Sequence, residues 1–104
     1  MSAPSSLQFV DTNILVYAHD LSAGDRHLCA RELVRRLSHS GEGCLSIQVL
    51  QEFYVAVTRK VAKPLAPELA AQIIADLSAW HVHSPTVQDV LDAIGLQQRC
   101  QTSF

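Results

Sequence analysis

The hydrophobic and polar positions of the chain alternate between short apolar runs and longer segments with helical spacing. The run from Leu7 to Val10 is typical of a central strand that helices cover on both faces. Two shorter strand candidates lie at 44–45 and 81–83. Helical periodicity predicts helices over 13–18, 25–39, 47–61, from Pro67 to about 80, and from Thr86 to about Arg99. Strands separated by helices predict a parallel α/β sheet, whose ligands lie beyond the carboxyl ends of its strands.

Local signals predict the ends and the buried faces of these helices. The candidate N-caps are Thr12 or Asn13 for the first helix, Asp25 for the second and Ser46 for the third. The segment 86–89 fits a capping box at the start of the fifth helix. Apolar stripes predict the following buried residues: Ile47, Leu50, Tyr54, Val57 and Val61 on the third helix, Leu69, Ile73, Leu77 and Trp80 on the fourth, and Val87, Val90, Leu91 and Ile94 on the fifth.

Length and composition predict one globular domain. The chain has 104 residues, 48% of them hydrophobic and 17% charged, which excludes a disordered protein. We expect a flexible lead-in over residues 1–6 and a single domain over 7–104. No apolar run approaches the ~20 residues that span a bilayer. The first residues have neither the basic nor the apolar region of a signal peptide, so we expect no membrane association and a cytoplasmic location.

The net charge and the cysteines argue against several other classes of protein. The net charge of −2 excludes a protein that binds nucleic acid through bulk positive charge, so any RNA contact requires a local basic patch. The three cysteines, Cys29, Cys44 and Cys100, are widely spaced and form no Cys-x-x-Cys pair. This odd, dispersed set argues against a disulfide framework or a zinc knuckle and predicts free thiols.

Asp11 is the first candidate for chemistry, because it stands where an apolar strand meets a helix. Hard divalent cations such as Mg²⁺ bind oxygen ligands, usually one or two carboxylates with water and substrate phosphate. The backbone N–H groups of the following helix are additional phosphate donors. The alternative is that Asp11 only caps the helix, and position alone leaves both interpretations open.

Glu52 is the second candidate, on the predicted third helix. At 100° per residue its side chain lies opposite the apolar stripe, where a solvated glutamate is usual. Arg59 points almost the same way, and Lys63 continues the line. A carboxylate followed by two cations suits a metal site beside a groove that binds phosphates, and it also suits a charged surface.

Two segments resemble the motifs of a known family. The segment from Phe9 to Tyr17 is similar to the opening motif of PIN-domain proteins, which include the VapC toxins of toxin–antitoxin pairs. The segment from Ser46 to Tyr54, with 57–60 and 64–65, is similar to the second acidic block of that family. The order, spacing and flanking apolar residues match in both. The resemblance implies a three-layer α/β fold with a short central parallel sheet flanked by helices.

The resemblance also implies a function. It implies an endoribonuclease that cleaves RNA phosphodiester bonds with Mg²⁺ or Mn²⁺, with Asp11 as the first metal ligand and Glu52 as the second. Thr12 and Asn13 would hold Asp11 and its water by hydrogen bonds. Arg59 and Lys63 would contact RNA. The implied partners are the RNA substrate, a protein antitoxin and a second copy of the chain in a homodimer.

The chain departs from the family pattern in one respect. PIN domains supply a third and often a fourth carboxylate after a Ser-Phe-Trp-like segment, and this sequence ends at Ser103-Phe104. Asp89 and Asp92 come too early to replace them. We therefore expect a domain incomplete at its C-terminus, with weak or absent nuclease activity. The alternative function is a non-catalytic remnant or split half that acts through self-association or partner binding. A nucleotide-binding module is disfavoured, because no Gly-rich loop follows the first strand.

Overall fold

The computed structural model describes residues 7–102. The expected lead-in over 1–6 and the segment Ser103-Phe104 lie outside the described residues. The elements follow in the order β1 (Gln8–Phe9), α1 (Thr12–His19), the 3₁₀ turn η1 (Leu21–Ala23), α2 (Asp25–Ser40), β2 (Gly43–Leu45), α3 (Ile47–Arg59), α4 (Pro67–Leu77), β3 (His81–Val82) and α5 (Val87–Thr102).

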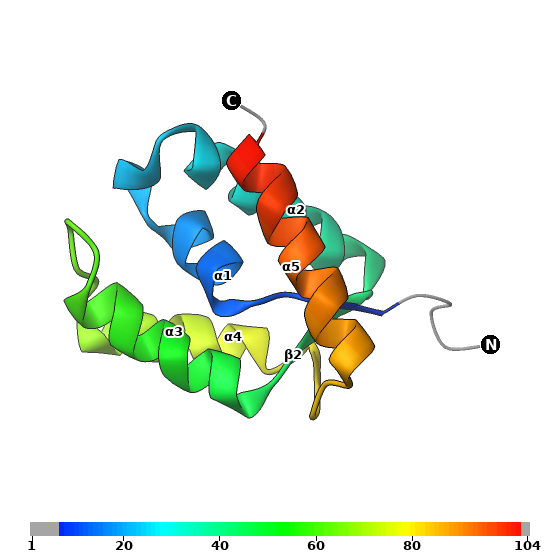
Figure 1. The fold of residues 1–104 in the computed structure, drawn as a ribbon. Coiled ribbons are helices and arrows are strands. Elements are labelled where there is room, and N and C mark those ends of the chain that lie inside the picture. Colours follow the sequence, from blue (N-terminus) through cyan, green and yellow to red (C-terminus); the bar gives the residue numbers. More distant parts are fainter. Residues whose placement is uncertain (1–6, 103–104) are drawn as a thin grey trace.

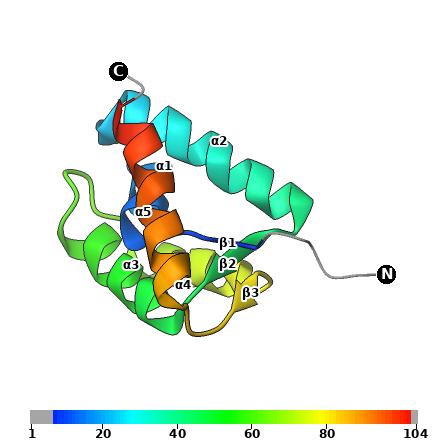
Figure 2. The ribbon, with the colours of Figure 1, turned by 45° about the vertical axis from the view of Figure 1, so that its right-hand side comes forward.

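A short parallel sheet forms the middle of the fold. Its strand order is β1-β2-β3, with Phe9 opposite Cys44 and Cys44 opposite His81. Helix α2 lies on one side of this sheet, and α3 and α4 lie on the other (Figure 1 and Figure 2). The predicted three-layer α/β architecture is confirmed.

Two hydrophobic clusters hold the layers together. The larger one contains Val10 at the end of β1, Leu45 of β2 and the completely buried Phe53 of α3, together with side chains of α1, α2, α4 and α5. The smaller one joins Phe9 and Cys44 on the sheet to Ala93 on α5. Helix α5 therefore contacts the rest of the molecule through the sheet and through the main core.

The helix caps agree with the sequence prediction in two places and differ in two. The Ser46 hydroxyl accepts from Val49 N at 3.1 Å, and residues 86 and 89 form the predicted reciprocal capping box. The N-cap of α1 is Asp11, and neither Thr12 nor Asn13. The N-cap of α2 is Gly24, and Asp25 lies in the first turn. There its negative charge interacts favourably with the helix dipole.

The predicted apolar stripe of α5 faces away from the core, so that prediction is wrong. Val87, Val90, Leu91 and Ile94 are exposed, Val87 to 78%, and the helix buries Ala93, Leu96 and Cys100 instead. Periodicity identifies an amphipathic helix, whereas the contacts of α5 with β1 and α2 decide which face is covered. Two other stripe residues, Ile47 and Leu69, are also exposed.

The cysteines also differ from the prediction of free thiols. Cys29 on α2 and Cys100 on α5 form a disulfide across a sequence separation of 71 residues. The packing of α2 against α5 brings the pair together, and no spacing rule for nearby cysteines could reveal it. Cys44 is free and buried, and its Sγ lies 3.2 Å from Nε2 of His83.

Candidate metal centre

Asp11 lies at the edge of the sheet where β1 and β2 end and α1 and α3 begin. It has extended backbone angles (φ −85°, ψ 172°), and its Oδ1 accepts a hydrogen bond from Ile14 N at 3.2 Å. Asp11 is thus the N-cap of α1, and its side chain is only half-buried. A carboxylate has about four acceptor positions, so the cap leaves room for a cation. The two interpretations of Asp11 are therefore compatible.

Glu52 is brought to the same edge by α3. The Thr12 hydroxyl donates a 2.8 Å hydrogen bond to Oε1 of Glu52, although 40 residues separate the two in sequence. Nε2 of Gln48, one turn earlier on α3, lies 3.5 Å from Oε2 of Glu52. These contacts hold an exposed glutamate beside the start of α1. Thr12 therefore contacts Glu52, whereas the family resemblance led us to expect contact with Asp11.

The electrostatics of Asp11 indicate that the two carboxylates influence each other. Burial raises the pKa of the Asp11 carboxyl above its ordinary value. Hydrogen bonds from the backbone N–H groups of Ile14 and Asn13 act in the opposite direction, and the negative charge of Glu52 raises the pKa further. Two carboxylates that repel each other at one edge of a fold form an environment that a cation stabilises.

The available ligands fit a hard divalent cation with a large share of water ligands. Carboxylate oxygens are the ligands that Mg²⁺ and Mn²⁺ prefer. Within residues 7–102 no group of three or more His, Cys, Asp or Glu side chains lies close enough to hold a metal ion. Asp11 and Glu52 would supply two carboxylates to a bound cation, and water or substrate phosphate would fill the remaining positions.

A groove beside Glu52 carries a different cation from those predicted. Its lining residues are Thr12, Asn13, Gln51, Glu52, Val55, Ala56 and Lys60. Lys60 follows Glu52 by two helical turns, a spacing that the sequence displays and that our prediction overlooked. Arg59 is exposed at the end of α3. Lys63 is exposed beyond that end, so it does not continue the helical line.

The comparison with protein families agrees with this geometry. The family model of the PIN domain matches residues 9–102. The chain belongs to the PIN-domain family. PIN domains are generally nucleases that act on RNA with divalent metal ions, and the match includes both carboxylates of the candidate centre.

The other comparisons add no named relative. No curated protein and no solved structure matches the chain. Among the helices of residues 7–102, none combines the length and apolar character that a membrane crossing requires. The family assignment therefore rests on the PIN-domain match.

Proposed function

We propose that this PIN domain is a VapC-type endoribonuclease, the toxin of a toxin–antitoxin pair, which cleaves RNA with Mg²⁺ or Mn²⁺ in the cytoplasm. The observation that carries the proposal is the hydrogen bond between Thr12 and Glu52, which joins the start of α1 to α3. It brings Glu52 to the edge where Asp11 caps α1. A protein antitoxin would restrain the enzyme, and the active form would be a homodimer.

Each residue of the site has a distinct proposed role. Asp11 and Glu52 would hold the cation, and Thr12 would fix the orientation of Glu52. Asn13, exposed in the same groove, would position a water or a phosphate oxygen. Lys60 in the groove, with Arg59 and Lys63 nearby in sequence, would attract the RNA backbone. A bound divalent ion would lower the pKa of its water and offset the charge that develops on the phosphoryl oxygens.

An apolar groove next to the acidic site supports a protein partner. It is lined by Ile47, Leu50, Gln51, Tyr54, Val55 and Ile74, and it shares Gln51 and Val55 with the groove around Glu52. An amphipathic helix of an antitoxin would place apolar side chains here. A basic side chain of the same partner would then reach Glu52 and block the cation site.

The alternative function is a non-catalytic remnant that acts by association. The two-carboxylate set within residues 7–102 favours weak binding of a hard cation, because affinity rises with the charge and number of ligands. The exposed apolar face of α5 favours association. Cleavage by the chain alone is therefore expected to be slow and to require high concentrations of Mn²⁺.

The decisive experiment is cleavage of a labelled single-stranded RNA during a Mn²⁺ titration. We expect slow cleavage that depends on Mn²⁺ and that both Asp11→Asn and Glu52→Gln abolish. Glu68→Gln, which alters an exposed glutamate on α4, is the matched control and should cleave like the unmodified chain. Cleavage that persists in both site variants would refute the proposed site. Absence of cleavage at every Mn²⁺ concentration would refute the nuclease and favour the alternative.

A further inference from the structure

A cavity opens between α2 and α5, directly beside the disulfide that joins these helices. Its volume is about 270 Å³, and both bonded cysteines line it, Cys29 from α2 and Cys100 from α5. Cys29 is half-buried, whereas Cys100 is only 2% exposed. A small molecule that enters this cavity therefore meets the disulfide, and Cys29 is the more accessible of its two residues. The other lining residues are Glu32, Leu33, Arg36, Leu96 and Arg99.

The charged side chains around this cavity leave an excess of positive charge. Arg36 and Arg99 are both exposed, and no ion pair within residues 7–102 engages either of them. The Glu32 carboxylate lies 2.6 Å from the guanidinium of Arg35, a residue outside the lining, and this contact offsets its negative charge. The cavity therefore favours an anionic molecule over a cationic one.

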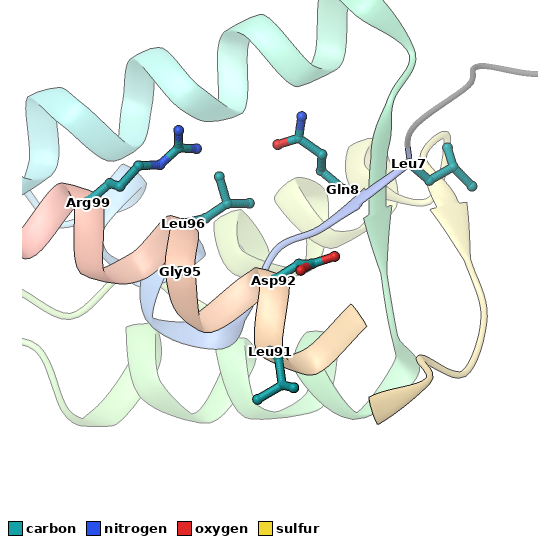
Figure 3. Close-up of a pocket in the computed structure, with 7 residues that line it drawn as sticks. All are labelled: Leu7, Gln8, Leu91, Asp92, Gly95, Leu96 and Arg99. Carbon is teal, nitrogen blue, oxygen red and sulfur yellow. The ribbon is translucent and has the colours of Figure 1, made fainter. Parts of the chain in front are cut away.

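The side chain of Arg99 extends toward the helix that carries Cys29. Figure 3 shows Leu96 and Arg99 reaching from α5 toward α2. Asp92, the acidic residue of α5 nearest to Arg99 in sequence, lies two turns earlier, at the groove between α5 and β1 (Figure 3). It accepts a 2.9 Å hydrogen bond from Gln88 and does not line the cavity at the disulfide.

A disulfide beside two arginines suits a small thiol that carries carboxylate groups. Guanidinium groups bind carboxylates through paired hydrogen bonds. Their positive charge also raises the local concentration of anions and stabilises the thiolate that a broken disulfide releases. In the cytoplasm, the location named in the proposed function, disulfides are usually transient because small thiols reduce them.

We propose that Cys29 is a site of reversible modification by a small anionic thiol of the glutathione class, whose carboxylates are held by Arg36 and Arg99. The thiol opens the disulfide to Cys100 and forms a mixed disulfide with Cys29. This modification does not require nuclease activity, and its test reads the mass of the protein, so its failure is distinguishable from failure of the proposed function.

Two molecules of the small thiol balance the reaction. The first loses its proton to water and attacks Sγ of Cys29 as a thiolate. The bond between the two cysteines breaks, and its electron pair goes to Sγ of Cys100, which takes up a proton. A second thiolate attacks the sulfur of the bound thiol and releases Cys29. In sum, two small thiols are oxidised to one disulfide and the protein disulfide is reduced, which removes the covalent link between α2 and α5.

The first test identifies the modified residue. The full chain is incubated with reduced glutathione, quenched with acid at intervals and mapped by mass spectrometry. We expect an intermediate with one glutathione on Cys29, followed by the reduced chain. Cys100→Ser should accumulate the same adduct with oxidised glutathione, whereas Cys29→Ser should react at least about tenfold more slowly, because Cys100 is buried. Cys29→Ser/Cys100→Ser should take up nothing, since Cys44 is also buried.

The second test asks whether the arginines select an anionic thiol. The rate at which the disulfide opens is measured with reduced glutathione and with cysteamine, a cationic thiol. We expect Arg36→Gln and Arg99→Gln each to slow opening by glutathione about 3- to 10-fold without slowing opening by cysteamine. Arg31→Gln removes an exposed charge of α2 outside the cavity and is the matched control, with unchanged rates. High salt should reduce the effect of both cavity variants, because salt screens exposed charges.

These arginine variants retain the disulfide, so the second test does not depend on the fold of the cysteine variants. Circular dichroism confirms the fold of every variant. An adduct on Cys44 or Cys100 in place of Cys29, no adduct with glutathione, or the same selectivity between the two thiols in both arginine variants as in the unmodified chain would each overturn the proposal.

Discussion

Helices α3 and α5 are both amphipathic, and their different surroundings show what a sequence pattern can and cannot specify. In α3 the side chains of Leu50, Phe53 and Val57 enter the core, and Glu52 on the outer face meets Thr12. In α5 the most regular apolar stripe is exposed, and smaller side chains such as Ala93 are buried. Periodicity therefore predicts a helix with one apolar face, and the neighbouring elements decide whether that face is covered.

The first prediction compares how much side chains of α3 and α5 contribute to the free energy of unfolding. Phe53→Ala removes a completely buried ring and should lower the free energy of unfolding by about 3–5 kcal/mol. Val87→Ala removes atoms from an exposed side chain and should change it by less than about 0.5 kcal/mol. Urea unfolding followed by circular dichroism measures both. Equal losses in the two variants would show that the apolar stripe of α5 is covered and not exposed.

The second prediction concerns how α5 is held. Because the bond between Cys29 and Cys100 closes a long loop, its reduction should lower the free energy of unfolding by about 2–4 kcal/mol. Urea unfolding with and without dithiothreitol measures the difference. The double variant Cys29→Ser/Cys100→Ser should lose all response to the reductant. Identical curves for the oxidised and reduced chain would contradict a disulfide between α2 and α5.

The third prediction tests the hydrogen bond that joins Thr12 of α1 to Glu52 of α3. Thr12→Val removes the hydrogen bond that orients Glu52 and should weaken Mn²⁺ binding about tenfold. Thr12→Ser retains a hydroxyl and should bind nearly as well as the unmodified chain. Electron paramagnetic resonance of free Mn²⁺ measures both affinities. Full affinity in Thr12→Val would mean that Glu52 needs no support from α1.

The smallest expected effect is the pH-dependent contribution of the Asp11 carboxyl to the stability of the fold. Since the folded state raises the pKa of this carboxyl, its contribution to stability is present at low pH and is lost as pH rises through the folded pKa. In EDTA, Asp11→Asn should therefore gain stability relative to the unmodified chain between pH 3 and pH 7. Thermal unfolding at several pH values measures the gain. A relative loss over that range would mean that ionised Asp11 is favoured by the fold.

Much of the fold was predictable because the relevant signals are local. Ser46 as a cap, the capping box at 86–89 and the strand ahead of Asp11 each depend on a few neighbouring residues. Other features depend on contacts between distant segments. The pairing of Cys29 with Cys100 and the exposed face of α5 follow from tertiary packing.

The features of the candidate centre were also predictable only in part. The motifs and their family resemblance predicted Asp11 and Glu52 as the important pair. The cap that Asp11 forms on α1 is a local contact, and the sequence offered it as one of two interpretations of this residue. The sequence did not show that the Thr12 hydroxyl binds Glu52, because that contact depends on how the N-terminus of α1 faces α3.

The most direct test of a shared metal centre is the anomalous difference map of a crystal soaked in Mn²⁺. We expect one Mn²⁺ peak at the start of α1, with oxygens of both Asp11 and Glu52 about 2.1 Å from the ion. A peak that contacts neither carboxylate, or separate peaks on the two, would contradict a shared metal centre.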